Sequence, residues 1–190
     1  GTAAGVAAAP SIANAAEMPT INWRLASSFP KNLDTIYGAA DTLANRVKEL
    51  TDGKFNIRPY AAPEIVPFNQ VMDAVKDGTV EMGHTASYYY YGKDATFAFD
   101  CAVPFGMNSR QQTAWMLYGN GMKLMREFFA EYNIVNFLGG NSGTQMGGWF
   151  RKEIKSVEDM KGLKFRVGGF AGKVLQRLGT VPVQLAGGEI

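Results

Sequence analysis

The order of strand-like and helix-like stretches between residues 21 and 87 limits the fold of this chain more than any other feature. Strand patterns lie at INWRLASSF, KFNIRPY and VEMGHTAS, and each interval between them carries apolar residues at helical spacing. Gly53 and Gly78 end the two predicted helices. Because strands that alternate with helices pair in parallel through crossover connections, we expect an α/β fold.

The pattern continues beyond this first group. Helices are predicted at Gln111–Tyr118 and Met122–Tyr132, and a further strand at IVNFLGG. A Gly-rich, polar stretch then indicates a hinge near Leu138–Ser142. A strand at Leu163–Val167, the helix FAGKVLQRLGT and the strand VPVQL follow it. We therefore expect a first α/β domain over residues 19–138 and the start of a second, incomplete α/β domain over 139–190.

Composition excludes several functional classes. The chain has 190 residues, is 46% hydrophobic and has a formal net charge of only +2. No basic stripe is present, so we expect no nucleic-acid partner. After the first residues, no apolar run reaches the length of a membrane span. The single cysteine, Cys101, has no second cysteine for an internal disulfide.

Both ends of the sequence have informative patterns. Residues 1–18 are rich in small apolar residues and include Ala13-Asn14-Ala15, which resembles the cleavage region of a signal peptide. An Ala-rich disordered tail is the alternative. We interpret this stretch as the remnant of an export signal, which predicts a periplasmic protein. At the other end, LAGGEI resembles the start of another loop or helix, so we interpret the chain as an N-terminal fragment.

A catalytic interpretation has little support in the sequence. His84 is the only histidine, and it lies in a predicted strand without an evident nucleophile partner. No nucleophile elbow, zinc-protease, P-loop or dinucleotide-binding motif is present. We expect no enzymatic activity. The alternative from another functional class is an α/β enzyme acting on a small organic acid, with His84 as its general base.

A binding interpretation has more support. Four consecutive tyrosines, Tyr88 to Tyr91, follow the third predicted strand, and strand alternation would turn two of them inward. Gln145 and Trp149 flank a Met-Gly-Gly turn just beyond the hinge. Arg166 ends a strand before Gly168-Gly169, where open α/β sheets bind ligands. Its planar guanidinium matches the two oxygens of a carboxylate.

The chain resembles the extracytoplasmic solute receptors of TRAP transporters, the DctP-type family, and in particular the branch that binds 2-oxo monocarboxylates. The most specific part is SVEDMKGLKFRVGGFAGKVLQRLGTVPVQLAGGEI, supported by EMGHTASYYYYGK and CAVPFGMNSRQQTAWMLYGNG. The resemblance implies a two-domain periplasmic binding protein fold of type II, truncated here within the second domain. It also implies TRAP membrane permease subunits as partners and a homodimer as a candidate state of the full-length protein.

The resemblance also assigns roles to residues. Arg166 would pair with the substrate carboxylate, and Gln145 would hold a cation that bridges protein and ligand, sodium as the first expectation and calcium as the second. No organic cofactor is implied. The ligand would be a small 2-oxo or 2-hydroxy monocarboxylate resembling pyruvate; a dicarboxylate, a sugar acid or an aromatic acid is the alternative. The expected ligand-binding set is Arg166, Gln145, Tyr88, Tyr89, Tyr90, Tyr91, Trp149 and Asn141.

Overall fold

The computed structural model of the chain describes residues 19–189, and the signal-like stretch 1–18 lies outside them. Its first sheet has three parallel strands, β1 (Ile21–Ser27), β2 (Phe55–Tyr60) and β3 (Met82–His84), in the order β2-β1-β3. The crossovers contain α1 (Asp34–Leu50) and α2 (Val71–Lys76). The predicted parallel sheet and its two helices are thereby confirmed.

The main hydrophobic core includes side chains from the segment after β3, among them Tyr89, Tyr90 and Phe97. Phe97 is completely buried, and its ring contacts the rings of Tyr90, Phe128, Phe129 and Tyr132 at centroid distances of 4.8 to 5.8 Å. These partners come from the tyrosine run and from the end of the helical hairpin described next. The aromatic cluster therefore fixes the tyrosine run against the rest of this part of the chain.

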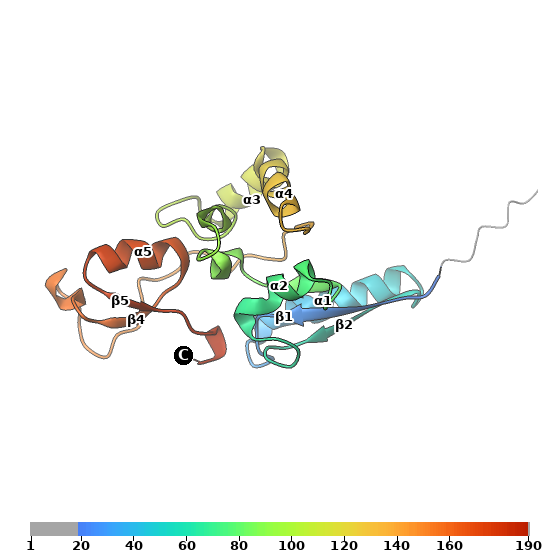
Figure 1. Cartoon of the computed structure of the whole chain (residues 1–190), viewed down its shortest axis with the longest axis horizontal. Helices are drawn as coiled ribbons and strands as arrows, with labels where there is room; N and C mark the ends of the chain where they lie inside the picture. Colours follow the sequence, from blue (N-terminus) through green and yellow to red (C-terminus); the bar gives the residue numbers. More distant parts are fainter. Residues whose placement is uncertain (1–18, 190) are drawn as a thin grey trace, which may run out of the picture.

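Two antiparallel-looking helices, α3 (Ser109–Tyr118) and α4 (Gly121–Ala130), pack against one another and project from the body (Figure 1). Asn108 and Gln111 form a reciprocal capping box at the start of α3. The turn between the helices is tight: a Cβ at Gly121 would lie 2.8 Å from the Trp115 ring. Both helices were predicted, with ends that differ by two residues or fewer.

Two local predictions were wrong. The stretch 134–140, predicted as a strand, has no regular structure, because no strand within the described residues pairs with it. The tyrosine run was expected to extend the third strand, but it forms a short 3-10 helix, η2 (Ser87–Tyr90). A 3-10 helix turns every three residues, so the two-in, two-out alternation of a strand does not apply.

A second, separate sheet pairs β4 (Lys164–Arg166) with β5 (Val181–Val183) in parallel, and α5 (Gly169–Arg177) connects them. We call β1–β3 with α1–α4 the first unit, and β4, β5 and α5 the second unit. The two lie side by side in Figure 1, and the end of the chain, η5 (Gly187–Glu189), turns back toward the first sheet. A Cβ at Gly188 would lie 2.5 Å from Pro30 Cγ, so this return is closely packed. The domain boundary at residue 138 stays a prediction.

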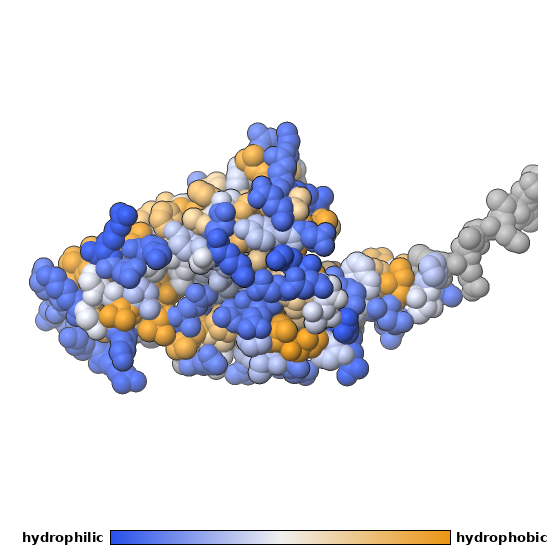
Figure 2. Space-filling model, in the orientation of Figure 1, coloured by the Kyte–Doolittle hydropathy of each residue, from blue (hydrophilic) through white to orange (hydrophobic). Residues whose placement is uncertain are grey.

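The surface carries many apolar side chains. Figure 2 shows hydrophobic patches scattered among hydrophilic ones over the visible face. Trp149, Phe105 and Tyr118 are at least 86% exposed.

Within residues 19–189, no helix combines the length and the apolar character that a bilayer span requires.

An exposed ion pair joins Arg24 of the central strand β1 to Glu81, the residue before β3, and it makes stability depend on pH in acid. Glu81 accepts hydrogen bonds from the Arg24 backbone at 2.7 Å and from its guanidinium at 2.8 and 3.2 Å. These bonds lower the pKa of Glu81 to about 2 from 4.5. A lowered folded-state pKa stabilises the fold above the unfolded value, and this contribution is lost as pH falls from 4.5 toward 2.

We therefore expect Glu81→Gln to reduce the loss of stability over that acid range. Urea midpoints measured between pH 6 and pH 2 should fall less steeply in the variant, by a small margin because the pair is exposed. Arg24→Gln should flatten the same limb, since it removes the pair from the other side. Identical acid limbs in all three proteins would contradict this role of the pair.

Candidate carboxylate site

Arg166 lies at the carboxyl end of β4, where the sequence placed it. Its Nε and Nη2 donate to the backbone carbonyl of Leu185 at 3.2 and 3.0 Å. A guanidinium has five N–H donors, so three remain for other acceptors. The carbonyl of Leu185 thus orients the guanidinium while leaving enough donors for a carboxylate. This contact was not predicted, because a backbone carbonyl leaves no signal in the sequence.

Tyr89 is the member of the tyrosine run that lies beside Arg166. Burial raises the pKa of Tyr89, and the nearby Arg166 guanidinium opposes this shift only in part. The hydroxyl is therefore neutral and able to donate a hydrogen bond near Arg166. Its ring is held by Phe68 at 5.0 Å and by Tyr88 at 4.6 Å between centroids.

The other three tyrosines have different surroundings. Tyr90 is 2% exposed, and its hydroxyl accepts from the Met72 amide and bonds to Thr85, so it belongs to the core. Tyr88 and Tyr91 are half-buried and face the second unit. Tyr91 stacks on Phe170 at 6.2 Å. The sequence could not distinguish these four environments, which depend on the 3-10 helix.

The structure places the remaining expected site residues in the irregular segment 139–157. The Asn141 side chain accepts from the Gly143 amide at 2.8 Å, and the Gln145 amide nitrogen donates to Ser142 at 3.0 Å. The Trp149 side chain points to solvent, with 86% of the residue exposed. Both polar side chains are thus bonded within their own segment. Their approach to Arg166 stays a prediction.

The side chains that could coordinate the expected cation are few. Among residues 19–189, no group of three or more His, Cys, Asp or Glu side chains is arranged to hold a metal ion. Gln145 uses its nitrogen toward Ser142, which leaves the amide oxygen as an acceptor of the kind that sodium and calcium prefer. Gln145 therefore fits as one oxygen ligand, while such cations take about six to eight.

The alternative catalytic centre is poorly suited to chemistry. His84 Nδ1 lies 3.3 Å from the Ser27 hydroxyl, which resembles a nucleophile and base pair. However, Ser27 is 1% exposed, and its oxygen already accepts the Phe29 amide at 3.1 Å. Burial also lowers the pKa of His84. A substrate has no access to this hydroxyl, so the pair is a structural contact.

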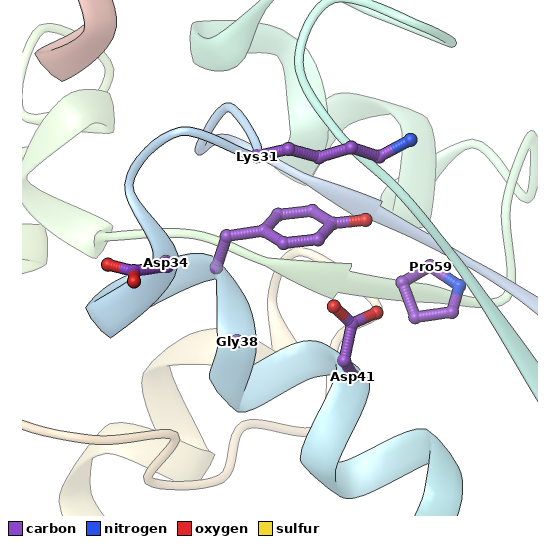
Figure 3. A pocket seen from close by; sticks show the side chains of 6 residues that line it. Lys31, Asp34, Gly38, Asp41 and Pro59 are labelled. Atoms are coloured by element: carbon purple, nitrogen blue, oxygen red, sulfur yellow. The ribbon is translucent and has the colours of Figure 1, made fainter.

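A separate cavity of about 340 Å³ lies on the α1 side of the first unit (Figure 3). Tyr37 and Asp41 of α1 and Pro59 of β2 contribute to its lining, together with Lys31, Asp34 and Gly38. The ammonium of Lys31 pairs with Glu64 at 2.9 Å. The carboxylates of Asp34 and Asp41 repel an anionic ligand, and Lys31 is already paired and does not offset them. The lining also includes no residue of the second unit. This cavity is therefore distinct from the Arg166 site.

Comparison with known proteins identifies the family. Residues 26–190 match the model of the DctP family, described as bacterial extracellular solute-binding protein, family 7. A periplasmic protein of Nostoc sp. named as monocarboxylate 2-oxoacid-binding is 53% identical over 175 residues, which is 92% of this chain and 48% of that protein. The chain thus spans about half the length of this relative.

Solved structures agree with this match. A TRAP transporter solute-binding protein from Bordetella bronchiseptica, a dimer with copurified calcium and picolinate, is 54% identical with a TM-score of 0.86, over 88% of this chain and 50% of that one. A protein from Pseudoalteromonas atlantica with bound sodium and pyruvate is 47% identical with a TM-score of 0.87, over 90% and 52%. A protein from Colwellia psychrerythraea with calcium and pyruvate is 44% identical with a TM-score of 0.86, over the same shares. The expected α/β class and family are confirmed, and the chain belongs to the DctP family of bacterial extracellular solute-binding proteins.

Proposed function

We propose that the whole protein is the periplasmic receptor of a TRAP transporter, that it binds a small 2-oxo monocarboxylate such as pyruvate, and that it delivers this ligand to the membrane permease. The observation that carries the proposal is the oriented Arg166 guanidinium beside the neutral Tyr89 hydroxyl. The relatives that hold pyruvate together with sodium or calcium support the choice of ligand.

Charge pairing explains how such a site works. A carboxylate that leaves water loses its hydration and must gain paired charges and hydrogen bonds in return. Arg166 would grip the two carboxylate oxygens, and the Tyr89 hydroxyl would donate a further bond. A cation held in part by Gln145 would supply the second positive charge toward the carboxylate and the keto oxygen. Tyr88 and Trp149 would provide apolar walls that favour a small ligand.

The proposal is of a receptor without catalytic activity. The family is one of transport proteins, and the only histidine is engaged with a buried serine. A homodimer in the periplasm is part of the proposal, supported by the dimer of the Bordetella bronchiseptica relative. Because His84 contacts the buried Ser27 and has no role at the ligand in this proposal, a conservative His84→Gln change should leave ligand binding intact.

A thermal-shift screen of the whole protein tests the ligand class. Pyruvate and 2-oxobutyrate would be compared with lactate, succinate, gluconate and benzoate. A ligand at about 100 times its Kd should add roughly 2.7 kcal/mol to the free energy of unfolding. We expect the largest shifts with the 2-oxo acids. A shift with succinate, gluconate or benzoate alone would redirect the proposal to that ligand class, and no shift with any acid would reject it.

Gln145 provides a separate prediction. Gln145→Ala should weaken pyruvate binding about tenfold at moderate sodium, the cost of one lost ligand to a bound ion being roughly that of one strong hydrogen bond. The variant should need a higher sodium concentration to reach the same affinity. Gln176→Ala, on the exposed face of α5, is the matched control. An unchanged sodium dependence in Gln145→Ala would remove the residue from this role.

A further inference from the structure

The tyrosine run of the first unit and the segment around β4 and β5 of the second unit meet in three places. The Gln184 side-chain amide donates to the backbone carbonyl of Tyr89 at 3.1 Å. The rings of Tyr91 and Phe170 stack with an interplanar angle of 13°. The ring of Tyr88 lies on the glycine pair that precedes and begins α5.

The contact between Tyr88 and Gly168 depends on a missing side chain. A Cβ at Gly168 would lie 3.2 Å from Cε2 and 3.4 Å from Cδ2 of the Tyr88 ring. Contacts this short force the neighbour to move. Gly168 has φ −115°, an extended conformation that any residue adopts. Gly169, by contrast, has φ +61°, so its glycine is explained by backbone conformation as well.

This contact adjoins the candidate carboxylate site on both sides. Tyr88 directly precedes Tyr89, and Gly168 lies two residues after Arg166. When Tyr88 rests on Gly168, the Tyr89 hydroxyl and the Arg166 guanidinium are brought near each other from different units. The contact between Tyr88 and Gly168 therefore lies between the two units and next to the candidate site.

We propose that Tyr88 and Gly168 form a latch between the two units, with Gln184 as a second positioning residue, and that this latch sets ligand affinity by stabilising the closed arrangement. The proposal rests on the proposed function. A contact made only in the closed state contributes to binding and adds nothing to the stability of the open, ligand-free protein. A permanent structural contact would instead stabilise the ligand-free protein and leave ligand affinity unchanged.

Gly168→Ala tests the latch without backbone strain. Overpacking the Tyr88 contact should raise the Kd for pyruvate by roughly five- to a hundredfold, as measured by calorimetry on the whole protein. The melting temperature of the ligand-free variant should stay within about two degrees of the wild type. Gly92→Ala is the matched control, because nothing lies within 4 Å of a Cβ there. An unchanged Kd would overturn the latch, and so would a ligand-free melting temperature lowered by more than about two degrees.

A second-site change identifies the partner. Tyr88→Leu removes part of the ring that an added methyl group would meet, so the Gly168→Ala defect should be smaller in this background than in the wild type. Gln184→Met, which keeps the length of the side chain and removes its donor, should weaken binding two- to tenfold. Equal Gly168→Ala defects in both backgrounds would rule out Tyr88 as the partner.

The distance between the units gives a readout that does not depend on the identity of the ligand. Spin labels at Lys48→Cys on α1 and Lys173→Cys on α5 would be used in a Cys101→Ser background, since both lysines and Cys101 are exposed. The wild type should contain a short-distance population that Gly168→Ala reduces. If pyruvate leaves the wild type unaffected, the proposed function fails, while identical distance distributions in the two proteins would reject the latch itself.

Discussion

Arg166→Met should weaken pyruvate binding by between about thirtyfold and several thousandfold. This range follows because removing one partner of a desolvated charge pair costs about 2 to 5 kcal/mol. The loss has two parts, because the ligand loses its bidentate partner and its carboxylate is left with the cation alone. Isothermal calorimetry on the whole protein measures it. The fold should persist, because Arg166 is only partly buried and its two hydrogen bonds go to one carbonyl.

Two further variants separate charge from geometry. Arg166→Lys keeps the positive charge and loses the planar fork, so its affinity should lie between those of the wild type and Arg166→Met. Arg177→Met, in the last turn of α5, removes an exposed arginine of the same unit and should leave affinity unchanged. If Arg166→Met and Arg177→Met bind pyruvate equally well, Arg166 is a surface charge and the assignment is wrong.

Phe97→Ala should cost about 3 to 5 kcal/mol of the free energy of unfolding, which is a large share of the total stability of a typical domain. The ring is completely buried among four aromatic neighbours, so truncation leaves a cavity at the centre of the main cluster. Urea unfolding of the whole protein, followed by tryptophan fluorescence, would measure this loss as a lower midpoint.

Phe105→Ala is the matched control, because the same side chain is there fully exposed. Its unfolding midpoint should stay close to that of the wild type. A loss below about 1 kcal/mol in Phe97→Ala would show that the aromatic cluster does not hold the tyrosine run in place. Equal losses in both variants would lead to the same conclusion.

Local patterns predicted most of the fold, since most elements here carry their own signal. The apolar spacing of α1, the glycine that follows α2 and the alternation of β2 can all be read within one segment. The stretch 134–140 has an equally strand-like composition, but a strand also needs a partner, and local composition does not reveal one. The same limit explains why the sequence predicts that the four tyrosines extend β3, whereas they belong to the turn of η2.

The candidate site was predictable to a different degree for each residue. Arg166 follows from its place at the end of a strand before a glycine pair. The roles of Gln145 and of a cation came from resemblance to a family and not from spacing. Tyr89 could not be chosen over Tyr90, because only the turn of η2 sends one hydroxyl toward Arg166 and the other into the core. Leu185 acts through its backbone, so no pattern of side chains could indicate it.

A carboxylate bridged by a cation can be detected by calorimetry on the whole wild-type protein with pyruvate and with propionate. Each acid would be titrated in sodium chloride and, after treatment with a chelator, in choline chloride. Propionate keeps the carboxylate and lacks the keto oxygen. We predict that pyruvate binds far more tightly than propionate, and that this preference falls sharply when sodium and calcium are removed. Equal affinities for the two acids, or pyruvate binding that is indifferent to the cation, would contradict a carboxylate held jointly by Arg166 and a bridging ion.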